Sequence, residues 1–309
     1  MNKPINQYPQ WHNLAAGAVA GAGARLATAP LDLLRIRRQL DKSVIYPRQS
    51  LWSSFATIAK DEGGVFALFR GNVAAIYLWV GYSAVQFAVY GRIKEWIEAK
   101  DGTQQSHPTA VAFVSGAIAG LAATLGTYPF DISRTIFAAR GLPQHSLQDA
   151  AGTFKPPKSL YDFAFSLYQQ KGLKGFYAGS GPASIQVVPY MGLNFAIYDY
   201  LTEEKRGVGF SAYAGMISGC VSKIIVYPID TIKKRMQEQA VFGPSGDTYE
   251  GTVDCLLKMS RKEGIRSFYR GLIPSVWKTG IATGLSFSLY RYTKNCLEAL
   301  HDNWEDDEQ

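Results

Sequence analysis

The sequence predicts an all-α membrane protein in which three tandem repeats form one body. A Pro-x-Asp-x-x-(Arg/Lys) motif begins at Pro30, again at Pro129 and again at Pro228, with a step of 99 residues each time. A Gly-x-x-x-Gly pair precedes each motif, and a stretch of glycine, four residues, an aromatic, one residue and glycine follows it. Self-similarity at a fixed period indicates a repeat architecture. The predicted repeats are residues 1–105, 106–205 and 206–309, the last with an acidic C-terminal tail.

Six stretches, two in each repeat, have the length and texture of membrane-spanning helices. They are rich in Gly, Ala and aromatic residues, and their polar residues fall at helical spacing, as expected where one helix face meets lipid and the other meets water. Each is about 36–45 Å of helix, enough to cross the hydrocarbon core. The predicted spans are residues 13–39, 72–96, 109–138, 179–202, 210–237 and 272–299. A soluble helical solenoid is the alternative, although solenoid repeats are usually much shorter.

The chain carries a net charge of +7, and its Lys and Arg residues gather in the loops that follow the three prolines. Basic loops mark the side of a membrane protein that is not translocated, which is the matrix for a mitochondrial inner-membrane protein. No nucleic-acid-reading motif accompanies the charge, so we expect no nucleic-acid partner. Cys220, Cys255 and Cys296 lack metal-ligand spacing, so we expect neither a metal site nor a disulfide framework. We see no nucleophile–base pair and expect no enzyme activity.

The repeated motif also predicts a closure of the path between the helices. Because each repeat holds two spans, all repeats enter the membrane in one orientation, around an axis along the membrane normal. A proline inside a helix bends it, so the first helices of the three repeats can meet on that axis. There the sequence supplies Asp32 with Arg35, Asp131 with Arg134, and Asp230 with Lys233. We interpret these residues as a ring of salt bridges between repeats; pairing along each helix surface is the alternative.

Polar stripes on the second helices predict the lining of the path. At a spacing of four residues they read Leu78, Tyr82, Gln86 and Tyr90; Gln186, Tyr190, Asn194 and Tyr198; and Lys278, Ala282, Ser286 and Tyr290. Arg25, Lys223 and Lys278 give three positive charges near mid-membrane, and we expect no spanning acid beside them. Such cations favour a small anionic organic substrate with diphosphate or carboxylate groups. The tyrosines, the amides and Trp277 offer contacts to its organic part. Snorkelling or structural cations are the alternative.

The triplicated motif and its flanking glycines resemble the mitochondrial carrier family over essentially the whole chain. The resemblance implies six tilted helices about a pseudo-three-fold axis, short matrix helices in the loops, and alternating access. It identifies the ring described above as a matrix gate, braced by Gln39 and Gln237, with Ala138 where the third glutamine is expected. The second repeat departs again at Lys171, where the family has Glu. The opposite, cytoplasmic gate maps to Tyr90, Lys94, Tyr198, Asp199, Tyr290 and Lys294, and it is poor in acids.

The resemblance also sets the functional expectation. Family contact points map to Leu78, Gln186, Val187 and Lys278. Short strings such as Gly81–Phe87 and Pro189–Leu193 are similar to those of family members that carry thiamine pyrophosphate. We therefore expect this compound as transported substrate, with no cofactor, in exchange for nucleotides. A carrier of adenine nucleotide or coenzyme A, and a proton or anion leak protein, are the alternatives. The expected setting is the mitochondrial inner membrane, with both termini in the intermembrane space, membrane lipid such as cardiolipin as partner, and a monomeric state.

Overall fold

The computed structural model describes residues 10–41, 50–101, 108–142, 159–202, 208–242 and 248–307, and every regular element in these ranges is a helix. The long helices are α1 (Gln10–Leu40), α4 (Asn72–Asp101), α5 (Pro108–Gly126) with α6 (Tyr128–Ala139), α9 (Ser180–Thr202), α10 (Val208–Phe242) and α12 (Leu272–Asp307). The shorter ones are α3 (Leu51–Asp61), η1 (Val65–Phe69), α8 (Leu160–Phe176), α11 (Thr252–Lys262) and η2 (Ile265–Tyr269). Each predicted span falls on a long helix, and the all-α prediction is confirmed.

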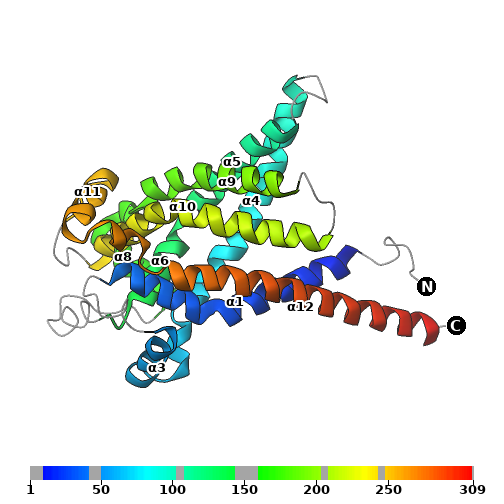
Figure 1. Ribbon diagram of the computed structural model, residues 1–309, viewed down its shortest axis with the longest axis horizontal. Helices are drawn as coiled ribbons and strands as arrows, with labels where there is room; N and C mark the ends of the chain where they lie inside the picture. The colour runs from blue at the N-terminus through cyan, green and yellow to red at the C-terminus, as the bar shows by residue number, and fades with distance from the viewer. Residues whose placement is uncertain are drawn as a thin grey trace.

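The long helices close into a ring. Contacts between repeats join α4 to α5, α9 to α10, and α12 back to α1, so the first and last helices of the chain are neighbours. In Figure 1, α8 and α11 lie at one end of the bundle, and the start of α1 and the end of α12 lie at the other. We call the end that carries the shorter helices α3, α8 and α11 the short-helix end. There α1, α6 and α10 contact one another, as a three-fold arrangement requires.

The repeated prolines act differently in the three repeats. Pro30 and Pro228 lie inside α1 and α10, which continue through them. In the second repeat the helix breaks at Thr127 ahead of Pro129, and the two halves meet at a bend of 58°. The predicted bend is therefore confirmed at Pro129, where the helix breaks, whereas α1 and α10 continue through Pro30 and Pro228. Beside the bend, the Thr127 hydroxyl donates a hydrogen bond of 2.7 Å to the Ala123 carbonyl oxygen. This bond gives a backbone oxygen near the break a side-chain partner.

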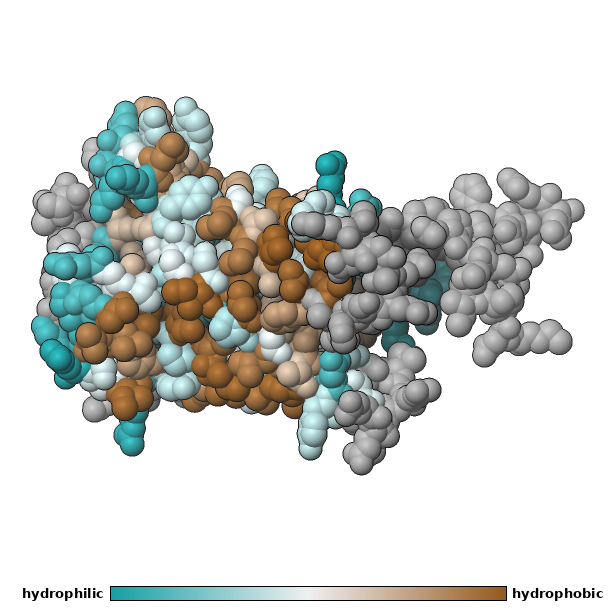
Figure 2. All heavy atoms as spheres, turned by 90° about the horizontal axis from the view of Figure 1, so that it is seen from above, coloured by the Kyte–Doolittle hydropathy of each residue, from teal (hydrophilic) through white to brown (hydrophobic). Residues whose placement is uncertain are grey.

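The outer surface is apolar along the middle of the bundle. By length and composition, Val65–Ile97 and Tyr213–Phe242 can cross a membrane, and the bent pair Phe113–Gly126 with Tyr128–Ala139 adds a third span. Figure 2 shows apolar residues gathered across the middle of one face and hydrophilic residues at its edge. Large apolar side chains on the long helices are exposed, such as Phe87 of α4 (77 % exposed), which fits contact with lipid.

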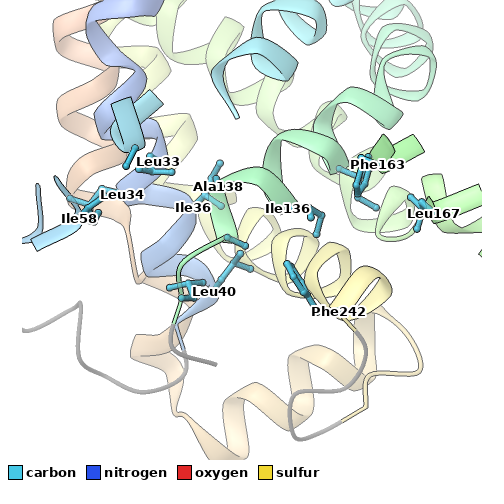
Figure 3. Packing of buried hydrophobic residues seen from close by; sticks show 14 residues of the cluster. Leu33, Leu34, Ile36, Leu40, Ile58, Ile136, Ala138, Phe163, Leu167 and Phe242 are labelled. Atoms are coloured by element: carbon cyan, nitrogen blue, oxygen red, sulfur yellow. The ribbon is translucent and has the colours of Figure 1, made fainter. Parts of the chain in front are cut away.

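A compact apolar core holds the short-helix end together. Its buried side chains come from α1, α3, α6, α8 and α10, so one cluster fixes elements of all three repeats (Figure 3). They include Leu33, Leu34, Ile36, Leu40, Ile58, Ile136, Phe163, Leu167 and Phe242. Serine caps fix the entry of two shorter helices: the Ser50 side chain accepts from the Ser53 N–H, and Ser159 from the Asp162 N–H, both at 3.1 Å.

The repeated glycines follow the expected pattern only in part. A β-carbon at Gly21 would lie 2.8 Å from the Trp79 ring, and one at Gly120 would lie 3.1 Å from Val187, so these two glycines allow close helix packing. The other members of the Gly-x-x-x-Gly pairs make no such close approach, because a β-carbon there would meet nothing within 4 Å. They are Gly17, Gly116, Gly215 and Gly219.

The stretch that follows each proline motif ends in a glycine, and the structure shows why glycine is needed there. Gly71 and Gly271 have φ of 80° and 86°, a region that side chains disfavour. A β-carbon at Gly271 would lie 2.7 Å from the Arg35 carbonyl oxygen, and one at Gly71 would lie 2.8 Å from the Arg134 carbonyl oxygen. These glycines therefore let the start of each second helix press against the backbone of a basic residue in another repeat.

Candidate functional site

Three ion pairs join the repeats where α1, α6 and α10 meet. Arg134 of α6 donates to Asp32 of α1, and Arg35 of α1 donates to Asp230 of α10. Lys233 of α10 lies 2.7 Å from Asp131 of α6. Each base thus reaches an acid of another repeat, and pairing along one helix does not describe these contacts. The three carboxylates are nearly buried, which raises the cost of breaking any one pair.

Two buried glutamines brace two of these pairs. Gln39 donates through Nε2 to Asp230 at 2.8 Å, and Gln237 donates through Nε2 to Asp131 at 2.9 Å. Both side chains are fully buried. Each amide ties a carboxylate from a neighbouring repeat to its own helix, so it adds to the ion pair without adding charge.

Tyrosines support the same two corners of the ring. The Lys233 ammonium lies 5.4 Å from the centre of the Tyr128 ring, and the Arg35 guanidinium lies 5.8 Å from that of Tyr227. Both distances fit a cation–π contact. The equivalent position in the first repeat, directly before the proline, is Ala29. One corner of the ring therefore lacks this support.

The Asp32 corner is built differently from the other two. It lacks both the tyrosine, because of Ala29, and the bracing glutamine, because of Ala138. The two missing side chains leave a cavity of about 10 Å³, about the size of one water molecule. Its polar lining comes from Arg25, Asp32, Arg70, Asn72 and Arg134. Arg25 Nε and Asn72 Oδ1 are buried and have no hydrogen-bond partner among the described residues.

The three cations predicted near mid-membrane are paired with aspartates of the ring, so the prediction that no acid stands beside them is wrong. Lys278 Nζ lies 2.7 Å from Asp32 Oδ1, and Arg25 lies 3.4 Å from the same carboxylate. Lys223 lies 3.4 Å from Asp230. A spacing of seven residues returns to the same helix face after two turns, so the sequence carried a signal for two of these pairs. The side chains of the cations remain 15–20 % exposed and are not sealed from solvent.

Lys234 is a ring residue that sequence reasoning missed. Its ammonium lies 3.0 Å from Asp131 Oδ1 and also donates to the Thr135 hydroxyl at 2.8 Å and to Gln237 Oε1 at 3.0 Å. It is 4 % exposed. Two of these partners, Asp131 and Thr135, lie on another repeat, about 100 residues away in the sequence, so no local pattern points to them.

A second layer of ion pairs lies toward the short-helix end. Arg37, fully buried, donates to both carboxylate oxygens of Glu62 at 2.5 and 2.8 Å, and Arg235 donates to Glu263 at 3.0 Å. The second repeat has Ile136 at the position of the two arginines and Lys171 at that of the acids. This layer is therefore made by the first and third repeats, as the departure at Lys171 indicated.

The residues predicted for the path are partly buried on the second helices. Tyr82, Gln86, Gln186, Tyr190 and Asn194 are all half-buried, whereas the adjacent apolar side chains Phe87, Ile185 and Phe195 are exposed. Tyr82 is hydrogen-bonded to Thr124. Asn194 Oδ1 is buried and has no hydrogen-bond partner among the described residues.

Trp277 does not belong with the path residues. It is 58 % exposed, and it shares its stripe of α12 with the exposed Ile273 and Ile281. That stripe lies beside the half-buried one that begins at Lys278. The prediction that the Trp277 ring meets the organic part of a substrate is therefore wrong.

The residues predicted for the opposite gate are spread over the far ends of α4, α9 and α12. The far ends of α4 and α12 diverge in Figure 1. Lys294 pairs with Glu298 of its own helix at 3.7 Å, and Asp199 is exposed. Tyr90, Tyr198 and Tyr290 are half-buried, and Lys94 is exposed. The Lys294–Glu298 ion pair therefore lies within one helix and does not connect one repeat to another.

The long helices of three repeats form a ring, and ion pairs between the repeats close it at one end. Basic side chains lie inside the ring next to these ion pairs. This arrangement defines a membrane solute carrier. The sequence profile described as "Mitochondrial carrier protein" matches this chain three times, at residues 6–101, 105–208 and 204–300. The chain belongs to the mitochondrial carrier family. Relatives in this family are transporters of the mitochondrial inner membrane, which fits a chain with several spanning helices.

Curated relatives resemble the chain over nearly its full length. The mitochondrial thiamine diphosphate carrier 1 of Arabidopsis thaliana is 31 % identical, with 92 % of this chain and 93 % of the relative covered. The mitochondrial thiamine pyrophosphate carrier 1 of Scheffersomyces stipitis is 33 % identical, with 94 % and 92 % covered. The protein of the same name from Phaeosphaeria nodorum is 35 % identical, with 93 % of each chain covered.

Proposed function

We propose that this protein transports thiamine pyrophosphate across the mitochondrial inner membrane in exchange for nucleotides, by alternating access. The observation that carries the proposal is the cation set Arg25, Lys223 and Lys278, which faces the interior above the closed ring. The names of the relatives support the same substrate. Arg and Lys donors suit a diphosphate, which offers several charged oxygens.

The path residues divide the work of binding. Arg25, Lys223 and Lys278 bind the diphosphate, while Tyr82, Gln86, Gln186, Tyr190 and Asn194 contact the thiazolium and pyrimidine rings. The unpartnered Asn194 oxygen supports a polar contact there, since a buried acceptor without a partner is costly. No cofactor or metal takes part in this scheme.

The ring of ion pairs acts as the gate on the matrix side. With the ring closed, the site opens toward the intermembrane space, where both termini also lie. Binding drives the exchange of states only if the substrate is held more tightly in the occluded state than in either open one. The residues at the far ends of α4, α9 and α12 form the second, weaker gate when that end closes.

A thermal-shift titration of the purified protein tests the substrate. A ligand that binds only the native state stabilises it, by about 2.7 kcal/mol when the ligand is present at one hundred times its Kd. The melting temperature rises as a result. We expect thiamine pyrophosphate to raise the melting temperature more than ADP or coenzyme A at equal concentration. A larger shift with ADP or coenzyme A would assign the protein to a different nucleotide or coenzyme substrate.

A further inference from the structure

The Asp32 carboxylate holds cations that the proposed site needs for its substrate. Asp32 contacts three basic side chains: Arg134 of the ring, and Lys278 and Arg25 of the substrate site. By contrast, Asp131 contacts Lys233 and Lys234, and neither of these belongs to the substrate site. Asp32 is therefore in contact with two substrate cations and Asp230 with one, Lys223 at 3.4 Å, whereas Asp131 contacts none of them.

The departures from three-fold symmetry explain why Asp32 takes these partners. At Asp230 and Asp131 a glutamine amide occupies one carboxylate oxygen, at 2.8 and 2.9 Å. No amide approaches Asp32 from the corresponding position, because Ala138 stands there. Lys278 instead reaches Asp32 Oδ1 at 2.7 Å. The lysine thus does for this corner what an uncharged amide does for the other two.

We propose that Asp32 is an internal competitor of the substrate for Lys278. In the substrate-free protein Lys278 closes the unbraced corner of the ring. A bound diphosphate draws Lys278 away and leaves Asp32 with fewer partners, so binding and loosening of this corner are one event. The inference rests on the proposed function, because it gives Lys278 a diphosphate to bind. It makes Asp32 both a gate residue and a determinant of substrate affinity.

The first test compares Asp32→Asn with Asp131→Asn. Both changes neutralise one ring aspartate and loosen the ring, but only Asp32→Asn frees Lys278. In thermal-shift or calorimetric titrations with thiamine pyrophosphate, Asp32→Asn is expected to lower the Kd about 3- to 5-fold, which is the upper part of the range for a partly solvent-exposed ion pair. Asp131→Asn is expected to leave the Kd within about twofold. An unchanged Kd in Asp32→Asn, or an equal fall in both variants, overturns the proposal.

A double-mutant cycle identifies the cation involved. In a Lys278→Gln background, where overall binding is weaker, Asp32→Asn is expected to lose most of its tightening effect, because the competing pair is already absent. If the same fold-change persists without Lys278, Asp32 acts only through the long-range electrostatic effect of its charge. That result would disprove competition between Asp32 and the substrate for Lys278.

A further measurement does not depend on Asp32→Asn folding. If Lys278 holds the unbraced corner closed, Lys278→Gln lowers the melting temperature of the ligand-free protein. A lysine kept for substrate alone, placed near Arg25 and Arg134, would on removal relieve repulsion and raise the melting temperature. A rise in the melting temperature of Lys278→Gln therefore contradicts the proposal.

Inorganic pyrophosphate separates this inference from the proposed function. It presents the diphosphate group without the thiamine rings, so the Asp32→Asn effect on its Kd tests only the competition. If pyrophosphate binding tightens as expected but thiamine pyrophosphate does not bind, the substrate assignment is wrong and the role of Asp32 stands. If thiamine pyrophosphate binds and neither ligand responds to Asp32→Asn, the role of Asp32 is wrong and the substrate stands.

Discussion

The two bracing glutamines make a matched pair for a stability prediction. Gln237 makes four hydrogen bonds: Nε2 donates to Asp131 at 2.9 Å and to Tyr128 Oη at 3.1 Å, and Oε1 accepts from Thr135 at 2.7 Å and from Lys234 at 3.0 Å. Gln39 makes one strong bond, to Asp230 at 2.8 Å, and its buried Oε1 has no partner among the described residues. The two side chains are equally buried.

We therefore expect Gln237→Ala to cost more stability than Gln39→Ala. A net hydrogen bond contributes about 1 kcal/mol, and more when one partner is charged, so a difference of two to three bonds corresponds to about 2–3 kcal/mol. The apolar volume lost is the same in both variants and cancels in the comparison. At about 2–4 °C per kcal/mol, Gln237→Ala should melt about 4–12 °C below Gln39→Ala.

The assay is thermal unfolding of both purified full-length variants beside the wild type, in one detergent and without ligand. Gln237 lies inside α10, whereas Gln39 is the second-last residue of α1. Alanine is the better helix former, so any gain in helix propensity is larger in Gln237→Ala and opposes the expected order. Equal melting temperatures, or a larger loss in Gln39→Ala, would refute the claim that hydrogen-bond number sets the strength of each corner.

Three further variants test other parts of the structure. Lys278→Ala should lower thiamine pyrophosphate uptake into liposomes at least about tenfold, since a charge-assisted bond is worth about 1.5–3 kcal/mol, whereas Lys60→Ala, an exposed lysine of α3, should retain most uptake; similar losses would place Lys278 outside the site. Gly271→Ala should lower the melting temperature sharply, because its φ is 86° and a β-carbon would meet a backbone oxygen of α1; an unchanged value contradicts this geometry. Glu62→Gln should cost about 3–5 kcal/mol in denaturant unfolding, because it leaves the fully buried Arg37 charge without its carboxylate, and a cost below 1 kcal/mol would show that the pair is open to water.

The sequence predicted the fold and the ring because both are repeated. Three copies of one motif place their prolines, acids and bases at equivalent positions, and a three-fold ring then brings each base to the acid of a neighbour. Gln39 and Gln237 followed from the same register. A single copy of the motif would have left pairing along one helix as an equal alternative, so the inference depends on the repetition.

The asymmetric features were harder to predict because they arise between repeats. The absence of a glutamine at Ala138 was visible, but its consequence, the contact of Lys278 with Asp32, joins residues 246 apart in the chain. Nothing local tells which carboxylate a long lysine side chain reaches. Lys234 was missed for the same reason. The error at Trp277 came from assigning its ring to the path, although it lies on the exposed apolar stripe with Ile273 and Ile281.

Exchange in reconstituted liposomes tests the central claim most directly. Wild-type protein in liposomes loaded with nucleotide should take up labelled thiamine pyrophosphate saturably, and liposomes loaded with buffer alone should take up much less. The account would be contradicted if uptake were no greater than in protein-free liposomes while the same preparation exchanged ADP. Thiamine pyrophosphate would then not be the substrate that the three basic side chains bind.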